Sequence, residues 1–168
     1  MRRSLLAALP VLALALLLQM AIISRINLLN GCADLILLIL AAWSLQERVR
    51  GAWVWGAAAG LLVGLVSGLP WYVYLVSYLG VVGLARLLTR RIWQAPLLAM
   101  FVVTLTGTIL LLMLTFAVRT LFEVRLVFSE AFMQIILPSA LLNLMLAIPV
   151  HALIRDLANW LYPASVTA

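Results

Sequence analysis

Charged residues are scarce in this sequence. Only 10% of its 168 residues are charged, while 67% are apolar. A water-soluble domain carries roughly 25% charged residues, because its polar side chains must separate the apolar interior from water. The composition therefore excludes a soluble domain and predicts an integral membrane protein.

Lysine is absent from the chain, and cysteine occurs once. All 11 basic residues are arginines, and with five acids they give a formal charge of +6. A nucleic-acid binder gathers its basic residues along an accessible groove with interleaved aromatics, but these arginines lie in small clusters between apolar runs. Nucleic acid is therefore not an expected partner, and the single Cys32 excludes an internal disulfide.

Recognisable catalytic motifs are also missing. The sequence has no paired carboxylates, no Cys/His metal-ligand spacing, no Ser/His/Asp set and no phosphate-binding loop. We therefore predict a non-catalytic protein without cofactor-binding or metal-binding residues. None of the five acids falls at the centre of a predicted span. Asp34 begins one span, where it could pair with Arg25 or complement the positive end of its helix.

The apolar runs predict an all-α membrane protein with six transmembrane helices in a single domain, residues 1–168. A span needs about 20 apolar residues, and charges or turn residues separate six apolar runs. The second run is short, which predicts local thinning of the bilayer or shelter by neighbouring helices. Pro70 suits the first turn of the fourth helix. The predicted spans cover residues 4–24, 32–45, 51–69, 70–88 and 93–118, with the sixth inside 129–154.

The arginines also predict an orientation, since cytoplasmic loops carry the excess of basic residues. Eight arginines lie on the side of the two termini and three on the other side, so we predict that both termini are cytoplasmic. The eight are Arg2, Arg3, Arg48, Arg50, Arg86, Arg90, Arg91 and Arg155, and the three are Arg25, Arg119 and Arg125. Tryptophans favour membrane interfaces; Trp43, Trp53, Trp55, Trp93 and Trp160 fall near predicted cytoplasmic ends, and Trp71 near the outer end.

A row of glycines marks one face of the third helix. Gly56, Gly60, Gly64 and Gly68 recur every four residues. Small residues on one helix face let another helix backbone approach closely in lipid. We favour packing against a helix of the same chain, with a face for a partner protein as the alternative.

A second row, on the sixth helix, combines small and polar residues. It consists of Ser139, Asn143, Ala147 and His151. An amide in hydrocarbon needs a hydrogen-bond partner, so Asn143 is expected to face protein rather than lipid. His151 could carry protons, but no carboxylate is predicted within the membrane to relay to it, which favours a structural or interfacial histidine.

In combination, several motifs resemble the rod shape-determining protein MreD family of bacteria. The likeness spans roughly residues 27–163. It lies in Asp34-Leu-Ile-Leu-Leu with Trp43 and a basic turn, the glycine run from Gly56 to Pro70 with Trp71-Tyr72-Val-Tyr74, the Arg90-Arg91 turn, and Leu137-Pro138 with Leu142-Asn143 and Pro149. Many family members carry an aspartate after the glycine run, where this chain has Leu65-Val66-Ser67.

The resemblance implies a non-catalytic six-helix subunit of the cell-elongation (rod) complex in the bacterial cytoplasmic (inner) membrane. Such a subunit would bind MreC and help to organise or regulate lateral peptidoglycan synthesis and cell shape. Further implied partners are RodA with its penicillin-binding transpeptidase, MreB and membrane lipid. The family is similar in fold to the substrate-binding S components of energy-coupling-factor vitamin transporters. An S component is therefore the alternative function, and an S-component-like bundle is the expected architecture.

Overall fold

In the residues that the structure describes, helices and one short hairpin are the regular secondary structure. The computed structural model describes residues 2–21, 27–47, 49, 51–91, 95–122 and 127–162. The helices are α1 (Arg2–Ala21), α2 (Leu35–Ser44), α3 (Ala52–Val66), α4 (Trp71–Arg91) and α5 (Pro96–Phe122), followed by α6 (Phe128–Ala131), the π-helical turn η2 (Phe132–Ile136) and α7 (Leu137–Leu161). Strands β1 (Asn27–Leu28) and β2 (Gly31–Cys32) pair in antiparallel register between α1 and α2.

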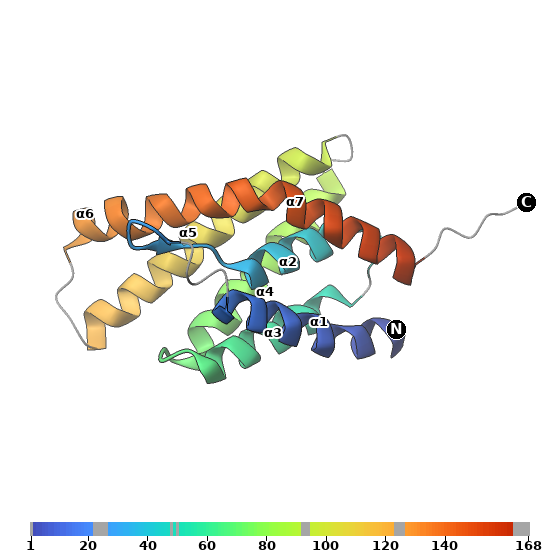
Figure 1. Ribbon diagram of the computed structural model, residues 1–168, viewed down its shortest axis with the longest axis horizontal. Helices are drawn as coiled ribbons and strands as arrows, with labels where there is room; N and C mark the ends of the chain where they lie inside the picture. Colours follow the sequence, from blue (N-terminus) through green and yellow to red (C-terminus); the bar gives the residue numbers. More distant parts are fainter. Residues whose placement is uncertain are drawn as a thin grey trace, which may run out of the picture.

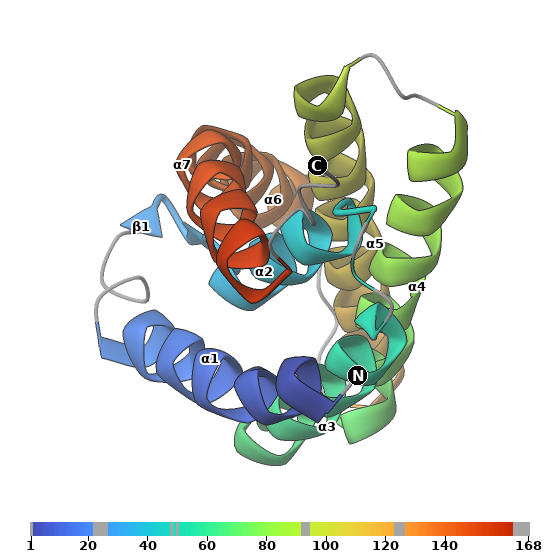
Figure 2. The same ribbon diagram turned by 90° about the vertical axis from the view of Figure 1, so that its right-hand side faces the viewer.

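The helices run back and forth along the long axis of the molecule (Figure 1). The start of α1 and the end of α7 lie at one end of the bundle, which we call the terminal end. The loop between α3 and α4 lies at the other end, which we call the far end. In the view along the bundle, α2 is central, with α7, α5 and the pair α1 and α3 around it (Figure 2).

Three helical stretches are long and apolar enough to cross a membrane. They cover Trp71–Thr89, Pro96–Phe122 and Phe128–Leu161, the last comprising α6, η2 and α7. The first three predicted spans correspond to shorter apolar helices, Ala8–Ala21, Leu35–Ser44 and Ala52–Val66. The structure thus contains a membrane-compatible bundle in which α1 has 20 residues, whereas α2 and α3, with 10 and 15 residues, are shorter than a typical span of about 20 residues.

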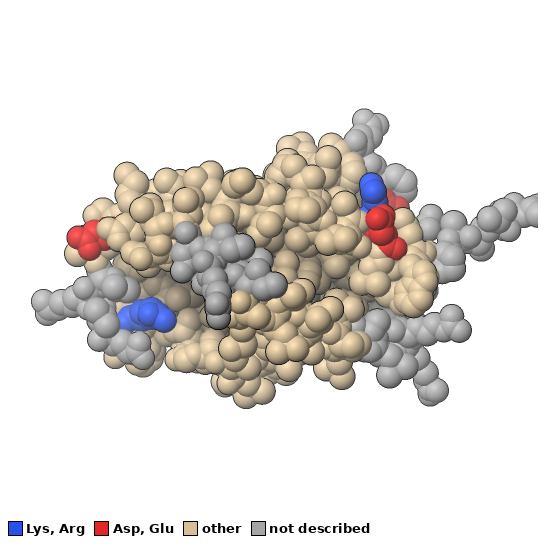
Figure 3. All heavy atoms as spheres, viewed as in Figure 1, with Lys and Arg blue, Asp and Glu red and all other residues tan. Residues whose placement is uncertain are grey.

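The exposed surface matches this membrane assignment. Large apolar side chains such as Leu141, Met145 and Leu153 of α7 are exposed, an arrangement that favours lipid over water. In Figure 3 the coloured charged side chains on the visible face lie near the two ends of the molecule and not along its middle.

The second predicted span differs from the helix that forms. A helix from Cys32 was expected, but residues 27–34 form the hairpin and an extended segment, and α2 begins only at Leu35. Every residue of α2 from Ile36 to Ser44 is buried. The expectation that neighbouring helices shelter this short span is therefore confirmed.

The central position of α2 also changes the role of two tryptophans. Trp43 and Trp55 were expected at a membrane interface, but both are fully buried and stack with ring centroids 4.3 Å apart. Because α2 is surrounded on all sides, a tryptophan at its end enters the core. Trp53, Trp71 and Trp160 are exposed, and Trp93 lies outside the described residues.

Candidate functional site

A buried polar network surrounds Asp34, the residue that precedes α2. Asp34 has extended backbone angles and caps the helix: its Oδ1 accepts the Leu37 N–H at 2.9 Å. Its Oδ2 accepts the Tyr78 hydroxyl of α4 at 2.9 Å. The prediction that Asp34 complements the positive end of its helix is confirmed. The alternative partner, Arg25, lies outside the described residues.

The hairpin turn and the extended segment before α2 lie along η2 and α7, and every second residue from 30 to 34 bonds to them. The backbone N–H of Asn30 donates to the Gln134 carbonyl at 3.1 Å. The Cys32 N–H donates to Ser139 Oγ at 3.1 Å, and the Asp34 N–H to Asn143 Oδ1 at 2.8 Å.

Two regular repeats explain this register. From Cys32 to Asp34, two extended residues advance about 6.6 Å, and from Ser139 to Asn143, four helical residues advance about 6 Å, so successive donors and acceptors stay opposite each other. Pro138 contributes as well. It has no N–H to donate to the carbonyl four residues earlier, which is that of Gln134. The Gln134 carbonyl oxygen accepts a hydrogen bond from the Asn30 N–H instead.

The network continues into two further helices. The Asn143 amide donates to Thr108 Oγ1 of α5 at 2.8 Å, and the Ile36 N–H donates to Gln19 Oε1 of α1 at 3.3 Å. Groups from α1, α2, α4, α5 and α7 therefore meet around the start of α2. As predicted, Asn143 faces protein, since only 1% of its surface is exposed.

The position of Asp34 along the bundle corrects one expectation. No acid was expected at the centre of a span, but Asp34 bonds to Asn143, near the middle of 128–161, and Asn143 in turn bonds to Thr108, near the middle of Pro96–Phe122. Because the chain after the hairpin turn is extended from Gly31 to Asp34 and leads into the bundle, a residue that was expected at the outer end of a span lies deep inside. A polar residue at this depth is costly in lipid unless it is paired, and Asp34 is.

The glycine row is divided between a helix contact and a loop. An added Cβ would lie 2.6 Å from Leu75 Cα at Gly60, 2.7 Å from Trp71 Cα at Gly64, and 2.9 Å from a Val82 methyl at Gly56. All three contacts are with α4. Gly68 lies beyond the end of α3, and no heavy atom lies within 4 Å of its Cβ position.

The polar row of α7 is buried along its length. Ser139, Asn143, Ala147 and His151 are at most 6% exposed. His151 Nδ1 has no hydrogen-bond partner among the described residues. A structural or interfacial role was favoured for His151 because no carboxylate was predicted within the membrane. Asp34 lies deep in the bundle, so that argument no longer holds.

Sequence reasoning missed the roles of Gly31 and Tyr78. A Cβ at Gly31 would lie 2.6 Å from the Ser139 backbone nitrogen, so a glycine is needed where the hairpin meets α7. Tyr78 looked like one aromatic of an apolar helix. The available signal was the Asn30-Gly31 pair, which is typical of a turn and precedes an acid in an apolar run.

Comparison of the chain with protein-family models, with curated proteins and with solved structures finds no match. These comparisons identify no family, so any functional interpretation rests on the residues and geometry described above.

Proposed function

We propose that this protein is a non-catalytic, six-span membrane subunit of the bacterial cell-elongation complex, of the MreD type. In this proposal both termini are cytoplasmic, and the protein binds MreC and helps to organise lateral peptidoglycan synthesis. The observation that carries the proposal is that Asp34 and Asn143, which bear the family resemblance, are hydrogen-bonded to each other in one network inside the bundle.

The way this network uses its polar groups supports a scaffold rather than an enzyme. Both Asp34 oxygens accept hydrogen bonds from the protein, and the Asn143 amide both accepts and donates one. These bonds fix the relative positions of helices and the extended segment. Side chains committed to one another in this way serve packing specificity.

The six-span topology draws support from the arrangement of the helices. The helices α1, α2, α3, α4 and α5 and the continuous stretch from α6 to α7 alternate in direction between the two ends (Figure 1), and the hairpin extends the short α2 toward the far end. The eight-to-three distribution of arginines supports cytoplasmic termini. Reporter fusions after Ala168 and after Glu123 test this: a cytoplasmic signal is expected at Ala168 and a periplasmic one at Glu123, and the reverse would overturn the orientation.

The cavity at the far end favours the scaffold over a vitamin-binding S component. Its volume is about 280 Å³, slightly below the usual range of about 300 to 1,000 Å³ for small-ligand sites. Apart from Thr115 and Arg119, its lining residues are apolar. A tight site for a polar vitamin needs several convergent polar groups.

Depletion of the protein in its own organism tests the function. We expect cells to lose their cylindrical shape under the microscope while vitamin uptake is unchanged. In parallel, affinity purification from native membranes should recover MreC. If cell shape is kept while the uptake of one vitamin collapses, the S-component function replaces the proposal.

A further inference from the structure

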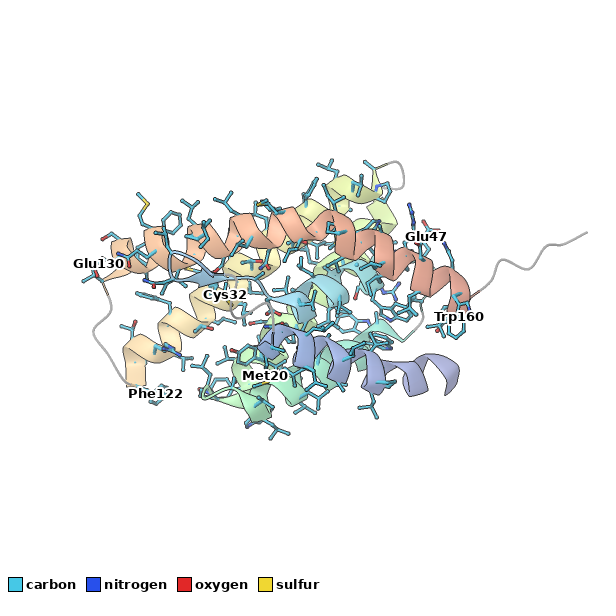
Figure 4. All side chains as sticks on the ribbon, in the orientation of Figure 1. Met20, Cys32, Glu47, Phe122, Glu130 and Trp160 are labelled. Carbon is cyan, nitrogen blue, oxygen red and sulfur yellow. The ribbon has the colours of Figure 1, made fainter. Side chains whose placement is uncertain are left out.

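A second cavity, of about 630 Å³, lies at the terminal end between the end of α2, the start of α5 and the last turns of α7. This volume is within the usual range for small-ligand sites, about 300 to 1,000 Å³. Its lining is amphipathic. Leu97 and Ile148 contribute apolar surface, while Glu47, His151 and Arg155 contribute polar and charged groups. Figure 4 shows Glu47 at this end of the bundle.

His151 is the buried polar group in this lining. Only 6% of its surface is exposed, and its Nδ1 has no hydrogen-bond partner among the described residues. A buried ring nitrogen without a partner is unfavourable, and a ligand in the cavity could supply that partner.

One wall of the cavity is held in place by a residue outside it. The Arg86 guanidinium of α4 donates to the carbonyl oxygens of Gln46 and Val49. Gln46 also donates from its side chain to the Ala42 carbonyl at 3.3 Å. These bonds fix the segment that carries Glu47, so the cavity is preformed on this side.

The charges of the lining select the kind of ligand. Arg155 is on α7 and Glu47 is on the segment after α2. A simple anion would meet the carboxylate, and a simple cation would meet the guanidinium. A zwitterion with both charges avoids this conflict, because each of its groups can face the opposite charge.

The apolar part of the lining favours a lipid over a water-soluble ligand. Leu97 and Ile148 line the cavity, yet they are 47% and 52% exposed on the outside of the bundle. Their side chains connect the cavity with the surface that faces acyl chains. Exposed Trp53 of α3 and Trp160 of α7 lie on elements of the same end, as expected at the level of lipid headgroups.

We propose that this cavity binds the headgroup of a zwitterionic aminophospholipid. The phosphate faces Arg155 and His151, the primary ammonium faces Glu47, and the acyl chains leave past Leu97 and Ile148. The site is independent of the proposed role in cell elongation, since it rests on the cavity alone.

Lipid titration of the full-length protein in detergent, followed by native mass spectrometry, tests the site. We expect phosphatidylethanolamine to bind about tenfold more tightly than phosphatidylcholine, whose methylated ammonium donates no hydrogen bond, or phosphatidylglycerol, which has no cation. Equal binding of the three lipids would overturn the proposal. Free phosphoethanolamine that binds as tightly as the lipid would assign the cavity to a soluble ligand and also overturn it.

Two variants with matched controls locate the site. Arg155→Gln should weaken the binding of phosphatidylethanolamine and of phosphatidylcholine by the same factor. Glu47→Gln should reduce the affinity for phosphatidylethanolamine to that for phosphatidylcholine. Both residues are exposed enough for the fold to tolerate the change. The controls Arg119→Gln and Glu130→Gln make the same changes near the far end and should leave binding unchanged. A preference that survives Glu47→Gln, unchanged binding of both lipids to Arg155→Gln, or an equal loss in the controls would refute the site.

Discussion

Replacing Gly60 by alanine should force α3 and α4 apart. The new Cβ would lie 2.6 Å from Leu75 Cα, whereas ordinary contacts begin at 3.4 Å. Because the obstacle is backbone, the helices must separate by about 0.8 Å, the difference between these two distances. A gap of this size forfeits a quarter to a half of the dispersion energy of the affected contacts. Overpacking of this kind costs about 1 to 3 kcal/mol.

The measured effect of Gly60→Ala also contains a gain, since alanine favours a helix over glycine by about 1 kcal/mol. Gly80→Ala is the matched control. Gly80 is inside α4, and its added Cβ would meet only the end of the Leu110 side chain, at 3.0 Å, which can move. The two variants share the propensity gain, so the difference between them isolates the steric cost.

We would measure the free energy of unfolding by titrating the purified protein with SDS in mixed micelles and following tryptophan fluorescence. Gly60→Ala should be less stable than Gly80→Ala by about 1 to 3 kcal/mol. Equal stability would refute the close contact between α3 and α4. A variant that is stable alone but no longer recovers MreC would instead assign this glycine face to a partner.

Three further changes test the network around Asp34 in the same assay. Tyr78→Phe leaves a buried carboxylate oxygen without a donor and should cost about 1 to 3 kcal/mol; no loss would mean that water replaces the hydroxyl. Asn143→Ala leaves the Asp34 N–H and the Thr108 hydroxyl without their partner, so it should cost more, about 2 to 4 kcal/mol, and a smaller loss than for Tyr78→Phe would contradict this ranking. Gly31→Ala places a methyl group against the α7 backbone and should cost about 1 to 3 kcal/mol; a neutral result would show that the hairpin is not seated on α7.

Matched controls exist for two of these variants. Tyr72 is exposed on the same helix as Tyr78, and Asn159 is exposed on the same helix as Asn143. Tyr72→Phe and Asn159→Ala should each change stability by less than about 0.5 kcal/mol, as is usual for surface positions.

The sequence predicted the helices well where helix formation is a local matter. Pro70 was expected to open the fourth helix, and α4 begins at Trp71. The glycine spacing and the polar row of the last helix both pointed to faces covered by protein, and Gly60 and Asn143 are buried. These features depend on periodicity within one segment, which a sequence displays directly.

The hairpin and the depth of Asp34 could not be predicted in this way. Residues 27–34 form a hairpin and an extended segment because Gln134, Ser139 and Asn143 accept from the backbone N–H groups of residues 30, 32 and 34. These acceptors follow the donors by more than a hundred positions in the chain. Hydropathy alone predicts a helix for this segment, because nothing in the apolar run itself indicates hydrogen-bond acceptors so far away in the sequence.

The extended segment has a consequence for how the protein is made. The ribosome synthesises the chain from its amino terminus, so residues 27–34 reach the bilayer long before residues 134–143 are made. Until the last helix arrives, the peptide groups that it later satisfies have no protein acceptor, and hydrocarbon offers none. The segment that leads into α2 therefore cannot take its final form on insertion, and until then it stays near the headgroups or forms a temporary helix. Completion of the bundle is then the last step of synthesis, and a chain truncated before residue 134 would keep its amino-terminal half unfinished.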